Sequence, residues 1–453
     1  MPQMSSKMER AEIGLGETHS DGRRVETQPA MTEIENSGKA LQMESVVERG
    51  NLLEALRRVK QNKGSPGVDG MMVEDMDAYL RENWVLIREQ LLAGTYRPSP
   101  VRRVLIPKSG GGERELGIPT VIDRFIQQAL LQVLQPIIDP TFSPHSYGFR
   151  PGRSAHQALR SARAFVAGGK RWVVDVDLEK FFDRVNHDAL MGRMEKRVQD
   201  KRILGLIRSY LEAGIMLHGV VIGRNEGTPQ GGPLSPLLAN VLLDDVDKEL
   251  EKRGHCFVRY ADDCNVYVAS ERAGKRVMAH LRRLYGKLRL RINESKSAVA
   301  RVTGRKFLGF SMWYGAKGAV KLRVAPQAMQ KMKEKVRQIT GRNGGRSIQN
   351  VVEDLGRYLP GWRNYFSLAD TPRIFNELDE WIRHRLRQIH LKQWKRGSTI
   401  YRELLARRVP EWIAREVAGN SGRWWHNSSM ALNHALPIKY FDELGLPRLG
   451  KVH

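Results

Sequence analysis

The chain has 453 residues, with 75 Lys and Arg against 50 Asp and Glu, which gives a formal net charge of +25. Its 41% hydrophobic and 28% charged residues are ordinary for a globular protein and exclude a wholly disordered chain. No apolar run reaches the roughly 18 residues of a membrane span. Two cysteines, Cys256 and Cys264, exclude a disulfide scaffold and a four-cysteine zinc site.

These properties predict a protein of the cytoplasm. The first ten residues carry no apolar segment of the kind found in secretory signals. A charge this positive favours a nucleic acid partner, because neutralised phosphates release condensed counterions. The alternative is a merely basic enzyme.

The start of the chain differs in charge from the rest. Residues 1–50 hold 6 basic and 9 acidic residues, and residues 1–42 lack aromatic side chains and sustained periodicity. We therefore predict a mostly disordered leader over residues 1–42. A helix is expected at Met43–Gln61, and the run Gly64–Gly70 ends it.

The middle of the chain alternates strands and helices by its apolar pattern. In chain order we predict a strand at Val101–Ile106 with a hairpin tip at 110–112, a helix at Asp123–Ile138, a strand at Trp172–Asp177, a helix at Pro236–Glu251, and two short strands within Phe257–Ala269 around a tight acidic turn.

From about Met329 the pattern becomes helical. One apolar stripe has helical spacing and consists of Leu378, Trp381, Ile382, Leu386 and Ile389. Basic residues fall largely elsewhere on the same segment, at Arg383, Arg385, Arg387, Lys392, Lys395 and Arg396. The stripe predicts a core face. The basic face, with six of the nine tryptophans after residue 331, favours nucleic acid over a merely solvated surface.

The acidic turn Tyr260–Asp263 places two adjacent carboxylates between strands. Carboxylates this close raise each other's pKa, and a divalent cation removes the repulsion. Hard oxygen ligands of this kind select Mg²⁺, which also binds substrate phosphates. An ordinary surface turn is the alternative interpretation.

A further carboxylate, Asp177, ends the apolar strand at 172–177. If it meets Asp262 and Asp263 at the end of one sheet, the three could hold two metal ions that activate a hydroxyl and orient a triphosphate. Asp175 is a rival on the same face, although it should lie deeper in the strand.

The segment Thr228–Pro236 contains three prolines and two adjacent glycines. Such a sequence fixes a turn, and glycine lets a ligand approach the backbone closely. It also opens a helix, a position suited to oxygen-rich ligands. A purely structural turn remains the alternative.

Taken in order, these segments resemble the conserved blocks of reverse transcriptases. The blocks are Ile106–Pro119, Asp177–Asp183, Thr228–Gly232, Tyr260–Asp263, Asn293–Lys296 and Phe307–Phe310. Downstream, Gly361–Phe366 resembles the thumb, or maturase, segment of group II intron-encoded proteins. Over roughly residues 45–450 the chain is thus similar to bacterial group II intron reverse transcriptase/maturases.

The resemblance implies an α+β, right-hand polymerase fold. Residues 43–327 would form fingers and palm, with an antiparallel sheet packed on helices, and residues 328–453 a helical thumb/maturase domain with a basic tail. The catalytic residues and Mg²⁺ ligands would be Asp177, Asp262 and Asp263, with the Leu178 carbonyl assisting at one of two ions.

The resemblance also implies binding residues. Nucleotide contacts would come from Lys108, Arg114, Phe182, Gln230 and Lys296, with Phe182 as a steric gate against the ribose 2′-hydroxyl. The notable alternatives are a core role for Phe182 and an exposed loop cation at Lys296. RNA contacts are expected from the residues Arg363, Arg383, Arg387, Lys392, Lys395 and Arg396.

The implied function is an RNA-directed DNA polymerase that also binds its group II intron RNA to assist splicing and supports intron mobility. Its partners would be intron RNA, an RNA template, a DNA primer, deoxynucleoside triphosphates and target DNA, with no membrane; a homodimer is one expected assembly. The alternatives are a host-adapted reverse transcriptase in repair or defence, and a splicing-only RNA-binding factor.

Two departures from the family pattern bear on this interpretation. Many members have Lys-Gly where this chain has Glu179 and Lys180, outside the acidic triad. Larger members add a DNA-binding segment and a zinc-supported endonuclease domain, for which this chain has neither length nor cysteines. We expect no second-strand cleavage and a primer from elsewhere, such as a nascent strand at a replication fork.

Overall fold

A computed structural model describes residues 41–450 with the exception of 108–112, 218–219, 223–225, 229–230, 343 and 430. The described chain divides into two compact units. The N-terminal unit comprises residues 41–308 and 312–320, and the helical unit comprises residues 309–311 and 321–450. The predicted leader lies outside the described residues except for 41–42, as does the predicted hairpin tip at 110–112.

The N-terminal unit contains nine α-helices among its described residues. They are α2 (Met43–Val46), α3 (Arg49–Asn62), α4 (Met76–Ala93), α5 (Val121–Ile138), α6 (Ala155–Ala167), α7 (His187–Met194), α8 (Lys201–Glu212), α9 (Ser235–Lys252) and α10 (Glu271–Lys287). The predicted helices at 123–138 and 236–251 are confirmed by α5 and α9.

The helix predicted at Met43–Gln61 is instead two helices, α2 and α3. Glu48 has an extended backbone, with φ −65° and ψ 138°, so the helix breaks there. The side chain of Asn51 donates to the Val46 carbonyl at 2.8 Å and thereby satisfies an oxygen at the end of α2. The apolar pattern runs across this break, which is why periodicity alone suggested one helix.

The described strands form three sheets. Their orders are β2-β1-β4-β5, β6-β7-β3-β8 and β11-β10-β9. The strands are β1 (Val101–Pro107), β2 (Glu113–Ile118), β3 (Trp172–Val176), β4 (Ile215–Leu217), β5 (Val220–Ile222), β6 (Cys256–Tyr260), β7 (Asp263–Val268), β8 (Ala298–Arg301), β9 (Lys306–Phe307), β10 (Phe310–Tyr314) and β11 (Val320–Val324). The predicted strands at 101–106 and 172–177 and the pair around the acidic turn are confirmed.

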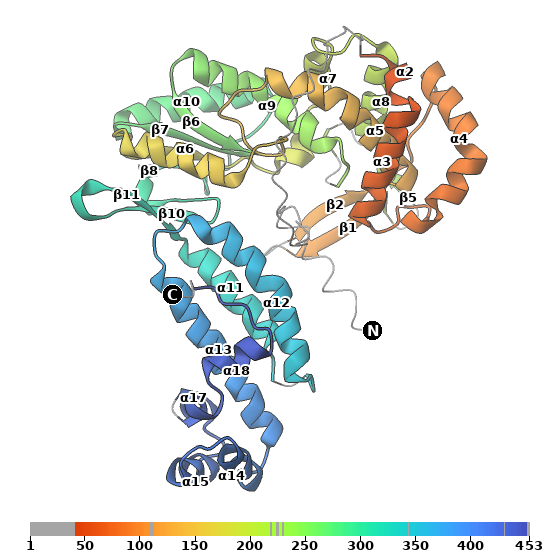
Figure 1. The fold of residues 1–453 in the computed structure, drawn as a ribbon. Helices are drawn as coiled ribbons and strands as arrows, with labels where there is room; N and C mark the ends of the chain where they lie inside the picture. The colour runs from red at the N-terminus through yellow and green to blue at the C-terminus, as the bar shows by residue number, and fades with distance from the viewer. Residues whose placement is uncertain are drawn as a thin grey trace, which may run out of the picture. The chain divides into compact units, whose positions relative to one another are not determined.

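The sheet β6-β7-β3-β8 is the centre of the N-terminal unit. Helices α6 and α10 both pack against it, and α9 packs against β6 (Figure 1). Its middle strands are apolar and fully buried at positions such as Val174, Val176 and Val266. Burial of this kind, at about 25 cal/mol per Å² of apolar surface, stabilises the packed sheet.

Helix α10 approaches this sheet closely because of one glycine. A Cβ added at Gly274 would lie 2.4 Å from a methyl group of Val299 on β8. Any larger side chain would push the helix away from the sheet, so Gly274 sets the spacing between the two layers.

The helical unit is built from α11 (Pro326–Ile339), α12 (Ile348–Tyr365), α13 (Arg373–Trp394), α14 (Gly397–Ala406), α15 (Glu411–Gly419), α16 (Trp424–Ser429), α17 (Ala431–Ala435) and α18 (Ile438–Glu443). On α13 the predicted stripe is confirmed: Leu378, Ile382, Leu386 and Ile389 are buried and Trp381 is half-buried. Asp379 accepts hydrogen bonds from the backbones of Leu449 and Gly450, which fixes the end of the described chain.

The α+β class with a helical C-terminal part is therefore confirmed. The predicted division between residues 327 and 328 stays a prediction, and the compact units separate between residues 309 and 321. Among the described helices, none is both long enough and apolar enough to span a bilayer.

Candidate active site

Three carboxylates lie at one end of the central sheet. In the antiparallel pair β3 and β7, Val176 is opposite Cys264, so the register continues to Asp177 opposite Asp263. Strand β6 ends at Tyr260, which is paired with Asp263 across the turn. The strand register therefore brings Asp177 beside Asp262 and Asp263, although more than 80 residues separate them in the chain.

The backbone of Asp177 is fixed by the segment after α10. Its N–H donates to the Ser297 hydroxyl at 3.0 Å, and its carbonyl accepts from the Asn293 N–H at 2.9 Å. The next residue, Leu178, bridges to Ile292 and is buried. These contacts hold the first carboxylate at the sheet's open end.

Lys296, predicted to bind nucleotide, lies beside the first carboxylate. Its Nζ is 3.8 Å from Asp177 Oδ2, and its side chain is 66% exposed. An ion pair this exposed adds little stability, so the ammonium can turn to another anion at small cost.

The carboxylates repel one another. Desolvation, followed by repulsion from Asp262, Asp177 and Asp175, raises the pKa of Asp263 to about 7. Because Asp263 retains contact with solvent, its desolvation is only partial, and the repulsion from its neighbours is the part that a bound cation would relieve.

The donor set fits a divalent metal ion. Carboxylate oxygens are the hard ligands that such ions prefer, and their mutual repulsion favours a cation between them. Within the described ranges, no three His, Cys, Asp or Glu side chains already form a group that could hold a metal ion. The three carboxylates thus match a divalent ion in the chemistry of their oxygens. How they would coordinate it is a matter for the proposal below.

The rival carboxylate Asp175 has a different environment. It lies opposite Asn265, one pair deeper in the sheet than Val176, and its Oδ2 is 2.6 Å from Arg305 Nη2. This guanidinium already neutralises Asp175, so Asp177 is the better candidate ligand.

The two phenylalanines after the first carboxylate differ in burial. Phe181 is 3% exposed and belongs to the core, whereas Phe182 is half-buried, with its ring centroid 5.0 Å from that of Phe181. The Phe182 carbonyl accepts from the Thr228 N–H at 2.7 Å. This hydrogen bond connects the backbone of Phe182 to the start of the proline- and glycine-rich segment Thr228–Pro236.

The adjacent glycines Gly231 and Gly232 serve packing within the protein. A Cβ at Gly232 would lie 2.4 Å from Gln127 Oε1, and one at Gly231, where φ is +132°, would lie 2.9 Å from the Gly117 carbonyl. These contacts favour the structural interpretation of the turn. Lys108, Gln230 and the side chain of Arg114 lie outside the described residues, so their predicted nucleotide contacts have no structural description.

Comparisons with known proteins identify the family of this chain. The family profile "Reverse transcriptase (RNA-dependent DNA polymerase)" matches residues 106–312, and "Group II intron, maturase-specific domain" matches residues 329–416. Protein YkfC of Escherichia coli is 35% identical over 300 residues, which cover 57% of this chain and 79% of YkfC. The chain belongs to the group II intron reverse transcriptase/maturase family.

Another member of this family is the group II intron-encoded protein LtrA of Lactococcus lactis subsp. cremoris. It is 39% identical over 195 residues, which cover 43% of this chain and 32% of LtrA. Nuclear intron maturase 1 of Arabidopsis thaliana is 38% identical over 94 residues, or 21% of this chain and 13% of that protein. As a reverse transcriptase/maturase, the protein is an RNA-directed DNA polymerase, and enzymes of this class work with divalent metal ions.

Two of the residues predicted to contact RNA are buried in the described conformation of this reverse transcriptase/maturase. Arg383 is 8% exposed and Arg387 is 4% exposed, so neither offers a surface charge. The Arg387 guanidinium donates to the Leu436 carbonyl at 3.0 Å and lies over the Phe441 ring, and desolvation lowers its pKa to about 10. Helices α16–α18 cover this side of α13, which turns an expected basic face into an interior one.

The other predicted RNA contacts vary in exposure. Arg363 is half-buried, lies 4.6 Å from the Phe375 ring centroid and donates to the Leu449 carbonyl, so it also has a structural role. Lys392 is half-buried with its Nζ 5.7 Å from the Trp424 ring centroid. Lys395 and Arg396 are exposed at the end of α13 and keep the predicted character of a basic surface.

Sequence reasoning missed the side chains that support the acidic turn. Arg259 on β6 and Asp247 on α9 form an ion pair in which both side chains are at most 1% exposed. The available signal was a charged residue inside the apolar strand Cys256–Tyr260, together with an acidic residue on the apolar face of α9. Such misplaced charges indicate a buried pair.

Proposed function

We propose that Asp177, Asp262 and Asp263 form the polymerase active site of this reverse transcriptase/maturase and hold two Mg²⁺ ions. The main support for this proposal is the strand register, which brings all three carboxylates to one end of the sheet β6-β7-β3-β8. When bound, such ions supply positive charge to the attacking primer oxygen and to the departing pyrophosphate. The Leu178 carbonyl, next to Asp177, is the proposed additional ligand.

The protein's own residues would orient the incoming nucleotide. Lys296 can leave its exposed pair with Asp177 and bind a phosphate oxygen. Phe182, half-buried beside the core residue Phe181, is placed to meet the sugar of the nucleotide. Lys108, Arg114 and Gln230 are assigned nucleotide contacts by their positions in the family's motifs alone.

The proposed second function is binding of group II intron RNA. The maturase-specific match at 329–416 supports it, and so does the charge of residues 331–453, which hold 23 basic and 12 acidic residues. Lys392, Lys395 and Arg396 near the end of α13 are the proposed contacts, with Arg363 secondary. Splicing chemistry would remain that of the RNA, and intron mobility would use the polymerase, with target DNA as a further partner in the bacterial cytosol. A homodimer stays an untested expectation.

A splicing-only factor is the alternative that the site argues against. A protein that had lost polymerisation would have no need to keep three mutually repelling carboxylates at one sheet end. For a host-adapted reverse transcriptase, the maturase-specific match at 329–416 is the opposing observation.

The test is an Asp262→Ala variant assayed for two activities. We expect DNA synthesis on an RNA template to fall by at least about 10³-fold, because an essential part of the metal site is removed. Splicing of the intron RNA should stay within about twofold, because the RNA surface is untouched. The matched control is Asp245→Ala, an exposed aspartate on α9 that pairs with Arg193. Loss of splicing equal to the loss of synthesis would contradict two separate functions.

A further inference from the structure

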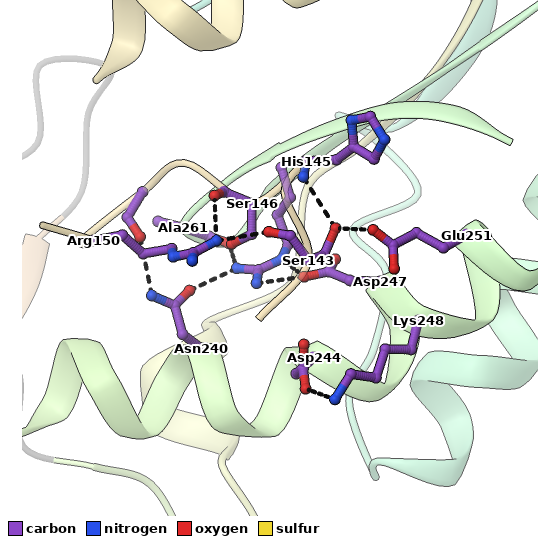
Figure 2. A network of polar contacts seen from close by, with 12 residues as sticks. Ser143, His145, Ser146, Arg150, Asn240, Asp244, Asp247, Lys248, Glu251 and Ala261 are labelled. Atoms are coloured by element: carbon purple, nitrogen blue, oxygen red, sulfur yellow. Dashed lines mark hydrogen bonds and ion pairs between the residues drawn. The ribbon is translucent and has the colours of Figure 1, made fainter. Parts of the chain in front are cut away.

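A buried polar network lies beneath the acidic turn, and its centre is Arg259. The network consists of Arg259 on β6, Asp247 and Asn240 on α9, and the backbone of Ala261 and Gly148. Figure 2 shows Asn240, Asp247 and Ala261 converging from α9 and from the turn. The three side chains are each at most 1% exposed. A buried ion pair is weak evidence of a contribution to stability, because desolvation offsets most of its attraction.

The Arg259 guanidinium connects the helix to the turn. Its Nε and Nη2 donate to the Asp247 carboxylate at 2.9 and 2.6 Å. Its remaining nitrogen, Nη1, donates to Asn240 Oδ1 at 2.8 Å and to the Ala261 carbonyl at 2.9 Å. The planar fork therefore reaches three different groups at once, which an ammonium on a flexible stem cannot reproduce.

The backbone that this fork holds is strained. Ala261 has φ +56°, a left-handed conformation that residues with a Cβ seldom adopt. Strained backbone persists only where the surroundings determine it, and such places cluster at functional sites. Ala261 directly precedes Asp262 and Asp263, so its conformation sets where both carboxylates lie.

The backbone of Gly148 packs against the same turn. A Cβ at Gly148 would lie 2.2 Å from the Ala261 nitrogen, so the two backbones are in direct contact. Asn240 Nδ2 donates to the Gly148 carbonyl at 3.0 Å while its Oδ1 accepts from Arg259. Asn240 thus connects the Gly148 backbone to the Arg259 guanidinium.

We propose that Arg259 is a positioning residue for polymerisation, which holds the Ala261 carbonyl and thereby sets the placement of Asp262 and Asp263. The proposal rests on the proposed function of those carboxylates. Asn240 and Asp247 act through Arg259: Asp247 supplies the countercharge, and Asn240 fixes the orientation of the guanidinium.

The chain offers a matched control on the same helix. Asp244, three residues before Asp247 on α9, is equally buried, and it pairs with Arg197 Nη2 at 2.7 Å and Lys248 Nζ at 2.7 Å rather than with a residue of the turn. Arg259→Lys and Arg197→Lys are the same chemical change in two arginines that each pair with a buried aspartate of α9. Only Arg259→Lys removes a hydrogen bond to the Ala261 carbonyl.

The experiment measures three quantities for both variants: the thermal midpoint, kcat and KM for deoxynucleotide in primer extension, and Mn²⁺ binding by electron paramagnetic resonance without nucleotide. For Arg259→Lys we expect kcat to fall by about tenfold or more with KM within about threefold, because a small misplacement of reacting groups has this effect. Its Mn²⁺ affinity should fall by about threefold or more. For Arg197→Lys we expect kcat and Mn²⁺ affinity within about twofold of the parent protein.

The proposal is overturned if folded Arg259→Lys keeps kcat within about twofold, or if Arg197→Lys loses as much as Arg259→Lys. Should Arg259→Lys fail to fold, Asn240→Ala decides, since it keeps the Arg259–Asp247 pair but removes the bonds that Asn240 makes to Arg259 Nη1 and to the Gly148 carbonyl. The same loss of kcat and Mn²⁺ affinity is expected, and unchanged values overturn the proposal. Failure of the proposed function is recognisable separately, because Asp262→Ala would then retain DNA synthesis.

Discussion

At the scale of single residues, Phe181 and Phe182 show how neighbours in sequence take separate roles. Phe181 is in the core, and its removal would leave a cavity beneath the turn. Phe182 is half-buried and its carbonyl accepts from the Thr228 N–H, which fixes its backbone; in the proposed site its ring lies at the edge that meets the sugar. A ring in that place would exclude an extra hydroxyl by size alone.

We predict that Phe182→Ala lowers the preference for deoxynucleotides over ribonucleotides by about tenfold or more, or about 1.4 kcal/mol in transition-state discrimination. The measurement is the ratio of kcat/KM for dCTP and CTP in primer extension. Phe181→Ala is the control: it should lower the free energy of unfolding by about 3–5 kcal/mol and leave that ratio unchanged. Unaltered discrimination in Phe182→Ala would remove the gate role.

The sequence identified residues whose chemistry is unusual for their position. Asp177 could be preferred over Asp175 because both lie on one face of the strand and only Asp177 is at its end; in the structure Asp175 pairs with Arg305. Arg259 could not be assigned, because its partner Asp247 is on a helix that the chain pattern marks only as apolar. Which strand packs against which helix is decided by tertiary structure, and the periodicity of a single sequence does not predict it.

At the scale of secondary structure, α13 shows both the power and the limit of periodic patterns. The apolar stripe from Leu378 to Ile389 was correctly predicted as a core face. The arginines between those positions were expected on the outside, yet Arg383 and Arg387 are buried because the short helices after α15 cover a second side of α13. A pattern along one helix cannot reveal a second covering layer.

This difference in burial predicts different effects for two cations of the α13 region, Arg387 and Lys395. Arg387→Ala should lower the free energy of unfolding by about 2–4 kcal/mol, since it leaves the Leu436 carbonyl unsatisfied and removes packing on Phe441. Lys395→Ala should leave stability within about 0.5 kcal/mol and reduce the slope of RNA affinity against salt by about 0.7–0.9. Urea unfolding measures the change in stability, and filter binding at several salt concentrations measures the change in the salt dependence of RNA affinity. A loss of stability in Lys395→Ala and a reduced salt dependence in Arg387→Ala would contradict the prediction.

The same helix predicts a dependence of stability on pH. His390 is 6% exposed and within 3.1 Å of the Tyr440 hydroxyl; desolvation, with repulsion from Arg407 and a smaller opposing effect of Glu403, lowers its pKa to about 4. The unfolded chain, with an ordinary pKa near 6.5, binds the proton first. Stability of the helical unit should therefore fall as pH decreases from about 6.5 to 4, by up to about 3 kcal/mol.

His390→Phe removes the titrating group and is the comparison for this prediction. Its unfolding midpoint in urea should change less than that of the parent protein between pH 7 and pH 4.5 when other carboxylate effects are common to both. Parallel pH profiles for the two proteins would show that His390 does not titrate in this range.

At the scale of the whole molecule, the two units carry two separable kinds of chemistry. The N-terminal unit presents acidic side chains at one sheet end, and the helical unit presents a basic excess along helices. The family's two profiles match them in the same order, at 106–312 and 329–416. Because catalysis needs bound cations and RNA binding needs surface cations, a substitution in one set should leave the other's activity in place.

The proposed polymerase activity depends most on the meeting of Asp177, Asp262 and Asp263 around divalent ions. The direct measurement is anomalous diffraction from crystals of the full chain soaked in Mn²⁺, with Asp262→Ala crystals as the comparison. We predict anomalous density about 2.2 Å from carboxylate oxygens of Asp177 and of the Asp262–Asp263 turn, and loss of that density in the variant. Mn²⁺ bound elsewhere, with the three carboxylates unoccupied, would contradict the account.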